Sequence, residues 1–324
     1  MKSIVYHYVR PSSGGLPYFR YLPLREFQQQ LNWFQSNEGV LSRSEFMRAL
    51  EATIPSKGVV LTFDDALRDH ITYVFPELQR RNLWAIFYVP TGIYRTCRLS
   101  HVHRVHFLVG KYGIETIFRM LAEVLDDEMI KRESVDAYES DTYRYQDTES
   151  KLLYIKRVLN FYLEAETRDF VLDTLMSRVG IDETVLFNSY YLSLDEIRTL
   201  SDAGMEIGSH GVSHTPFSNL SIARQEEEIE ESVAFLNSVT KGDIITFCYP
   251  YGGRHSYSSE TVSLLEKSDL KYSFDVEARN ISAEDIRLNI HMLPRYDCNQ
   301  FPHGISIVGD VSSDAPVVPG GVGA

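Results

Sequence analysis

The chain has few cysteines and no long apolar run, and each shortage excludes a class of protein. Its 324 residues include three cysteines, Cys97, Cys248 and Cys298, which lie far apart and form no CxxC pair. Such a sparse, odd count does not suggest a disulfide framework and suits a reducing compartment. No apolar stretch approaches the roughly 18 residues of a membrane span, and the first ten residues are too polar for a signal-peptide core. We therefore expect a cytoplasmic protein without a membrane span.

The chain also has fewer basic than acidic residues. The chain has 32 Lys and Arg against 45 Asp and Glu, a net charge of −13. Nucleic-acid phosphates would be repelled by such a chain, so we expect no nucleic-acid partner. Hydrophobic residues make up 44% of the sequence, which is enough for a large buried core.

The pattern of apolar residues favours alternating strands and helices. Strands are predicted at residues 2–9, 59–63 and 84–89, with helices at 22–37 and after residue 70. The alternation resumes at Ser193, where Glu196 three positions later completes a helix-capping pattern. This order predicts an α/β fold with a parallel sheet.

The alternation breaks over residues 95–190, which read as mainly helical. We expect a helical insertion whose edge lines the substrate site, since added loop length costs little closure entropy. Its acidic part, residues 123–149, suits a solvated face or a loop. Residues 311–324 are mostly small residues with Gly and Pro, and we expect a flexible tail there.

Polar side chains follow three predicted strands, which are residues 59–63, 205–208 and 244–248. The run TFDD at residues 62–65 contains adjacent carboxylates, SHGVSH at 209–214 has two histidines four positions apart, and YPYGG at 249–253 is a turn. Loops after the carboxyl ends of parallel strands are where such folds bind ligands. Singly, each motif has an ordinary explanation as a turn, a helix cap or a chance spacing.

Together the three motifs indicate a hydrolytic metal site. One carboxylate and two histidines make a 2-His-1-carboxylate ligand set with positions open for water and substrate. Imidazole ligands suit zinc and its neighbours, so we expect a divalent metal: zinc first, with cobalt, nickel or iron as alternatives. The second carboxylate would lie beside the metal as a base.

These motifs resemble, in the same order, those of the polysaccharide deacetylases, also called NodB-homology or carbohydrate esterase family 4 proteins. TFDD is similar to their first motif, the histidine pair of residues 210–214 to their second, and YPYG at 249–252 to a variant of their third. The resemblance covers residues 1–93 and about 194–310. It implies a distorted (β/α)7 barrel over residues 1–310, with the helical insertion at 95–190.

The resemblance also implies a role for each motif residue. Asp64 would be the catalytic base, and the backbone N–H of Tyr251 would help to hold the oxyanion. The metal ligands would be Asp65, His210 and His214.

The chain departs from the family pattern at three places. Ala66 stands where glycine is frequent, a small change if the turn avoids positive φ. Cys248 stands where many members have an arginine, and Arg295 is our candidate for a replacement cation beside the base, with a surface salt bridge as the alternative. The late histidine that acts as general acid lacks a clean motif. By order along the chain His291 is the best candidate, although it could be a core histidine, and His303 is second.

The function implied is removal of the N-acetyl group from an N-acetylated sugar. We expect the substrate to be a nucleotide- or lipid-linked sugar in cytoplasmic O-antigen or capsule precursor synthesis, a branch of surface-glycan biosynthesis. Two alternatives stay open. The chain could be a catalytically weak carbohydrate-binding protein on the same fold, or a deacetylase of a non-sugar amide or O-acetyl ester.

Overall fold

The structure, a computed structural model, describes residues 1–131, 135, 142 and 149–309. The chain divides into two compact units. The first comprises residues 1–11, 22–97 and 187–306, and the second comprises residues 12–21, 98–186 and 307–324. The expected tail at 311–324, and most of the acidic stretch after residue 131, lie outside the described residues.

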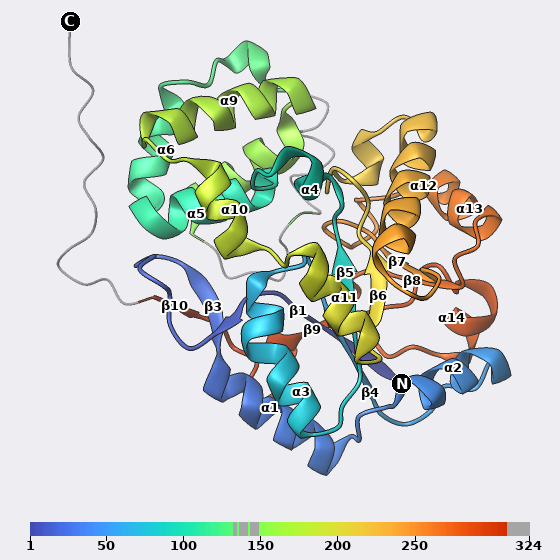
Figure 1. The fold of residues 1–324 in the computed structure, drawn as a ribbon. Helices are drawn as coiled ribbons and strands as arrows, with labels where there is room; N and C mark the ends of the chain where they lie inside the picture. The colour runs from blue at the N-terminus through green and yellow to red at the C-terminus, as the bar shows by residue number, and fades with distance from the viewer. Residues whose placement is uncertain (132–134, 136–141, 143–148, 310–324) are drawn as a thin grey trace, which may run out of the picture. The chain divides into compact units, whose positions relative to one another are not determined.

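Seven parallel strands form one curved sheet in the first unit (Figure 1). In spatial order they are β8 (Tyr272–Phe274), β7 (Thr246–Cys248), β6 (Glu206–Ser209), β5 (Ala85–Val89), β4 (Val59–Phe63), β1 (Lys2–Tyr6) and β9 (Tyr296–Asp297). Most are short runs of β-branched and aromatic residues, which pack well when buried. The predicted distorted (β/α)7 barrel is confirmed, in the form of a curled half-barrel.

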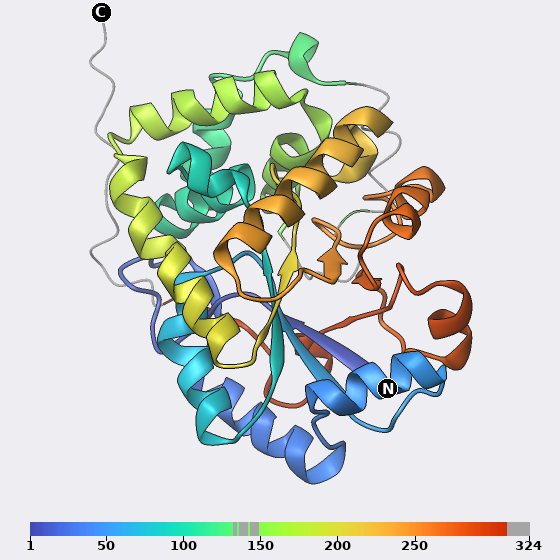
Figure 2. The same cartoon turned by 45° about the vertical axis from the view of Figure 1, so that its right-hand side comes forward.

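Helices surround this sheet (Figures 1 and 2). They are α1 (Leu24–Asn37), α2 (Arg43–Ala52), α3 (Phe75–Arg80), α4 (Gly92–Thr96), α11 (Leu194–Asp202), α12 (Ile222–Val239), α13 (Ser259–Lys267) and α14 (Ala283–Leu288). Ser193 and Glu196 form the predicted capping box at the start of α11. Short helical turns are η1 (His70–Val74), η4 (Phe217–Asn219) and η5 (Cys298–Gln300).

Side chains of successive strand residues point to opposite faces of the sheet, which creates two cores. On β4 and β5, Leu61, Phe63 and Phe87 belong to the larger core, which also includes residues of the surrounding helices. Ile86 and Tyr88 belong to a smaller cluster with residues of β7, β8 and α2. The concave face of the sheet is therefore filled with side chains, as in other small barrels.

One segment, residues 290–297, closes the gap between the two ends of the sheet. The amide of Ser273 in β8 donates to the carbonyl of Ile290, and Leu293 and Ser273 also bond through their backbones. A few residues later, β9 pairs with β1 through Tyr296 and Asp297. The two late candidates of the sequence, His291 and Arg295, both lie on this closing segment.

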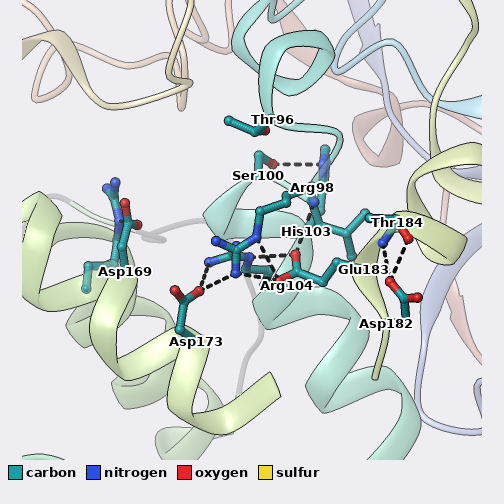
Figure 3. A network of polar contacts seen from close by, with 12 residues as sticks. Thr96, Arg98, Ser100, His103, Arg104, Asp169, Asp173, Asp182, Glu183 and Thr184 are labelled. Carbon is teal, nitrogen blue, oxygen red and sulfur yellow. Dashed lines mark hydrogen bonds and ion pairs between the residues drawn. The ribbon is translucent and has the colours of Figure 1, made fainter. Parts of the chain in front are cut away.

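The second unit is mainly helical in its described part. Its helices are α5 (His101–Tyr112), α6 (Ile114–Ala122), α8 (Ser150–Arg157) and α9 (Ala165–Arg178), with the turns η2 (Asp127–Met129) and η3 (Val158–Tyr162). The helix α10 (Glu183–Tyr190) begins in this unit and ends in the first. Arg104 of α5 is buried and donates to Glu183 and to Asp173 of α9, and Arg98 pairs with the same two carboxylates (Figure 3).

Some predicted boundaries shift by a few residues. The strand expected at 2–9 ends at Tyr6, and a short strand, β2 (Val9–Arg10), follows and pairs with β3 (Arg20–Pro23). The helix expected from residue 22 begins at Leu24, because residues 22 and 23 belong to β3. In the second unit, β3 also pairs with β10 (Ile307–Val308). Within the described residues, every helix is too short or too polar to cross a membrane.

Candidate metal and catalytic site

The three sequence motifs meet at the carboxyl ends of neighbouring strands in the first unit. Asp64 and Asp65 follow β4, and His210 follows β6 directly. The third motif begins where β7 ends at Cys248. Parallel strands place all these ends at one edge of the sheet, which is why residues about 145 positions apart come together.

The three predicted metal ligands form a compact, buried cluster. One carboxylate oxygen of Asp65, Oδ1, lies 3.0 Å from Nε2 of His214 and 3.6 Å from Nε2 of His210. Donors bound at about 2.0–2.1 Å around a tetrahedral zinc ion are separated by about 3.3 Å. The observed distances bracket this separation, so the residues present fit a divalent metal of this size.

The orientation of His210 also suits a metal ligand. Its Nδ1 lies 2.7 Å from the carbonyl oxygen of Cys248, a contact that places the hydrogen on Nδ1 and leaves the Nε2 lone pair facing Asp65. Burial lowers the pKa of His210 to about 4. The ring is therefore neutral at pH 7, as metal binding requires.

The motif backbones are strained where the functional side chains lie. Of the eight non-glycine residues with positive φ among the described residues, four belong to the motif turns: Asp65 (78°), Ala66 (53°), His214 (56°) and Tyr251 (67°). Such conformations cost about 1–3 kcal/mol each and persist only when the surroundings enforce them. The turn after Asp65 therefore does not avoid positive φ, and replacing glycine by Ala66 is a larger departure than the sequence suggested.

Asp64 is held by the predicted replacement cation. Nη1 and Nη2 of Arg295 each donate to one carboxylate oxygen of Asp64, both at 2.8 Å. Both side chains are almost fully buried. Burial alone would raise the pKa of Asp64, but the guanidinium more than offsets this and the pKa lies below its ordinary value. Asp64 is therefore an oriented, ionised carboxylate beside the predicted metal ligands.

The guanidinium of Arg295 has an acceptor for each of its five N–H groups. Besides the two bonds to Asp64, Nη1 donates to Oγ1 of Thr62 at 3.0 Å and Nε donates to the carbonyl of Asp275 at 3.1 Å. Nη2 lies 2.8 Å from the sulfur of Cys248. This complete set of acceptors compensates the cost of burying the cation. Arg295 is not in a surface salt bridge.

The third motif places Tyr251 beside the predicted metal ligands. The rings of Tyr251 and His214 lie 5.3 Å apart. Gly252 follows with φ at 56°, and a Cβ there would lie 2.3 Å from a methyl carbon of Val276. Only glycine fits this turn, so the motif sequence fixes the backbone that presents Tyr251.

The two candidate histidines for the general acid lie in different surroundings. His291 is buried, and its Nδ1 lies 2.9 Å from Oγ of Ser273. Burial lowers the pKa of His291 to about 4. His303 pairs with Glu26 of α1 at 2.9 Å, a partly exposed contact outside the three motifs.

One residue at the site was not singled out from the sequence. His7 follows β1, and its Nε2 lies 3.9 Å from Oδ2 of Asp65, whereas the other two histidines pair with Oδ1. Its side chain is 46% exposed. His7 was missed because the predicted first strand, residues 2–9, included it, whereas β1 ends at Tyr6 and leaves His7 at the carboxyl end of the strand.

Comparisons with known proteins agree with the motifs. The family model described as polysaccharide deacetylase matches residues 169–273, which include the second and third motifs. No curated protein matches the chain. The resemblance to polysaccharide deacetylases predicted from the sequence is confirmed by this match and by the solved structures below.

Several solved structures share the fold. The deacetylase PplD of Streptococcus pyogenes, in complex with acetate, has a TM-score of 0.56 at 17% identity, covering 92% of this chain and 91% of its own. IcaB from Ammonifex degensii has a TM-score of 0.51 at 17% identity, covering 91% of each chain. A de-N-acetylase from Aggregatibacter actinomycetemcomitans has a TM-score of 0.51 at 14% identity, covering 91% and 93%.

Proposed function

We propose that this chain, which its sequence and its fold both place among the polysaccharide deacetylases, is a metal-dependent hydrolase that removes the N-acetyl group from an N-acetylated sugar. The observation that carries the proposal is the cluster of Asp65, His210 and His214 beside an ionised Asp64. A metal site with an adjacent carboxylate base is a hydrolytic arrangement. The names of the similar structures, a deacetylase with acetate and a de-N-acetylase, support the same reaction.

Asp65, His210 and His214 would hold the metal, with zinc first and cobalt, nickel or iron as alternatives. A bound divalent ion supplies Lewis acidity to the acetyl carbonyl and to water. Asp64 accepts the proton of the attacking water. The guanidinium of Arg295 keeps this carboxylate charged and fixes both of its oxygens, so that proton transfer starts from a defined geometry. The backbone N–H of Tyr251 donates to the oxygen on which charge develops.

The departing amine needs a proton, and the chain offers two donors. We retain His291 as the proposed donor. The geometry adds His7 as the alternative, because its ring is half exposed and lies beside Asp65. A general acid must be protonated when it acts, and burial lowers the pKa of His291 to about 4. His291 would therefore act only if bound substrate raised its pKa.

The position of Arg295 bears on the non-catalytic alternative. Two features favour a protein without turnover: the cysteine at position 248, where an arginine is frequent, and the lack of a clear motif for the general acid. Arg295 supplies a guanidinium to Asp64 from the closing segment instead, so the base still has a cationic partner. This contact favours an active enzyme over a carbohydrate-binding protein that has lost turnover.

For the substrate, we propose an N-acetylated sugar carried on a nucleotide or a lipid, in cytoplasmic O-antigen or capsule precursor synthesis. The test is acetate release from three substrates: an N-acetylated nucleotide sugar, an N-acetylglucosamine oligomer and an O-acetyl ester, each with added zinc, cobalt or nickel. The proposal predicts release from an N-acetylated sugar that needs both metal and Asp64. Release from the ester alone would favour the esterase alternative, and no release from any substrate would favour the binding protein.

We further propose that the helical segment, residues 95–190, contributes to substrate choice. Its two ends are close within the first unit, since the rings of Tyr94 and Phe187 lie 5.9 Å apart. A short linker could therefore replace the residues between them at small closure cost. Such a deletion should leave metal content unchanged and alter the relative rates on the three substrates. Unchanged relative rates in a folded deletion variant would refute this role.

A further inference from the structure

The loop that joins the two histidine ligands is irregular. Residues 211–213 lie in neither a helix nor a strand, and Gly211 adopts a positive φ of 72°. Both Nε2 atoms must nevertheless face the same oxygen of Asp65. Something outside the loop must therefore hold its backbone in place.

The carboxylate of Glu228, on α12, binds this loop directly. Its Oε2 accepts hydrogen bonds from the backbone N–H groups of Val212, at 2.6 Å, and Ser213, at 2.8 Å. Its Oε1 accepts from Nη2 of Arg224 at 3.1 Å. The residue is 1% exposed. A Cβ at Gly211 would lie only 3.2 Å from Oε2, so the loop and the carboxylate are fitted closely.

The loop is also held from its other side. The amides of Thr91 and Gly92 donate to the carbonyls of Gly211 and Val212, at 3.0 and 2.9 Å. The helix that carries Glu228 is itself tied to the strand before the loop, because Oγ of Ser232 lies 2.6 Å from Oγ of Ser209. Glu228 therefore supports the loop from a rigid element rather than from another loop.

We infer that Glu228 is a positioning residue for the metal site, setting the distance between His210 and His214 through the backbone of the loop that joins them. A carboxylate this deeply buried is costly unless its oxygens are hydrogen-bonded. Here two of the donors that compensate the cost are the amides between the ligands, so the same contacts that stabilise Glu228 fix the ligand geometry. The inference rests on the proposed metal-dependent function.

The expected effect is a loss of metal affinity without a loss of fold. Outer contacts that orient metal ligands typically contribute about 10–100-fold to affinity. Glu228→Ala should therefore weaken zinc binding by about that factor. Glu228→Gln keeps one oxygen acceptor in the same place and should stay within a few-fold of the unaltered protein.

Gln225, on the same helix, provides a matched control. It is also buried, and its Nε2 donates to the carbonyls of Phe217 and Leu220 rather than to the histidine loop. Gln225→Ala removes a buried side chain that also bonds to a backbone. It should lower the melting temperature while leaving zinc affinity unchanged.

The experiment measures zinc affinity by competition with a chromophoric chelator, the absorption spectrum of the cobalt-loaded protein, and the melting temperature without metal, for the full chain and each variant. Weakened zinc affinity with an altered cobalt spectrum in Glu228→Ala, but not in Gln225→Ala, supports the inference. Equal zinc affinity in Glu228→Ala and the unaltered protein overturns it, as does equal weakening in both alanine variants.

Should Glu228→Ala fail to fold, Glu228→Asp replaces it, because the shorter side chain draws the carboxylate back from the loop. Its zinc affinity is then compared with that of the unaltered protein in the same way. An unaltered protein that binds no zinc would instead refute the proposed function.

Discussion

The guanidinium of Arg295 donates two parallel hydrogen bonds to the carboxylate of Asp64, although 231 positions separate the two residues along the chain. Both groups are buried, and the rings of Tyr88 and Phe274, which belong to the smaller core cluster, lie near the guanidinium. The two side chains are held in this one geometry, because no solvent water reaches them to take the place of either partner. The stability of the first unit and the state of its proposed base are therefore linked.

This linkage predicts a strong coupling between the two side chains. Arg295→Met should lower the free energy of unfolding by about 3–5 kcal/mol, because it leaves the Asp64 carboxylate buried without its counter-charge. The double variant Asp64→Asn, Arg295→Met should lose less than the sum of the two single losses. Urea unfolding of all four proteins measures the coupling, and strictly additive losses would show that the pair does not interact as described.

Removal of the two proposed histidine ligands should abolish metal binding. The double variant His210→Ala, His214→Ala leaves Asp65 as the only ligand of the proposed set, so metal content should fall to background. Mass spectrometry of metals after dialysis against a weak chelator measures this. A double variant that retains a full equivalent of metal would contradict the ligand assignment.

Asp64 is predicted to act in catalysis without holding the metal. Asp64→Asn keeps the shape of the side chain and removes its basic oxygen. Metal content should stay near one equivalent, while turnover should drop by about 10²–10⁴, the usual contribution of general acid–base catalysis. Near-normal turnover by the metal-loaded variant would remove Asp64 from the role of base.

Two single variants distinguish the candidate proton donors. His7→Gln and His291→Gln each keep a polar side chain but cannot supply the proton. The donor's variant should lose about 10²–10⁴ in kcat on an amide and much less on an ester, whose leaving group needs little protonation. In the variant of the histidine that is not the donor, kcat should either be unchanged or fall by the same factor on the amide and on the ester. If neither variant distinguishes amide from ester, neither histidine is the donor.

A buried histidine outside the proposed ligand set should make stability depend on pH. Burial lowers the pKa of His70 to about 4 in the folded protein, against about 6.5 in an unfolded chain. Between these values only the unfolded chain binds the proton. The contribution of neutral His70 to the free energy of unfolding is therefore complete above about pH 6.5. It is lost as the pH falls toward 4, an effect of about 3 kcal/mol.

The matching variant is His70→Gln, which keeps a donor for the carbonyl of His7, the present partner of Nε2. Urea midpoints from about pH 7 down to about pH 4 should fall less steeply for this variant than for the unaltered protein. Parallel pH profiles of the two proteins would show that His70 does not contribute.

The strands, and the motifs from which the ligand set is proposed, could be recognised in the sequence because their signals are local. A buried strand is a short apolar run, and a ligand pair such as His210 and His214 is visible as a spacing. The capping box at Ser193 was equally readable, since both of its residues lie within one turn. The family resemblance then placed these local signals on one fold.

The remaining features depend on contacts between distant residues. Arg295 could be named only as a candidate, because its pairing with Asp64 requires the path of the closing segment. Glu228 carried no signal, since a glutamate in a charge-rich helix reads as exposed, yet it is buried against a loop that precedes its helix. The left-handed conformation of Ala66 was also unreadable, because no local rule places alanine there.

The order of events during synthesis follows from the closing segment. In the seven-stranded sheet, β1 is made first and its outer neighbour β9 last. On the ribosome, the edge of β1 that does not face β4 therefore has no partner until β9 is made. At about 5–20 residues per second, roughly 12–46 seconds pass before Arg295 is added to a nascent chain that already contains Asp64. Throughout this interval the carboxylate lacks its guanidinium and the sheet keeps an open edge able to pair with another chain. The first unit can therefore complete its sheet only after residues 296–297 have been made, and slow translation of the residues before them would extend its exposure to aggregation.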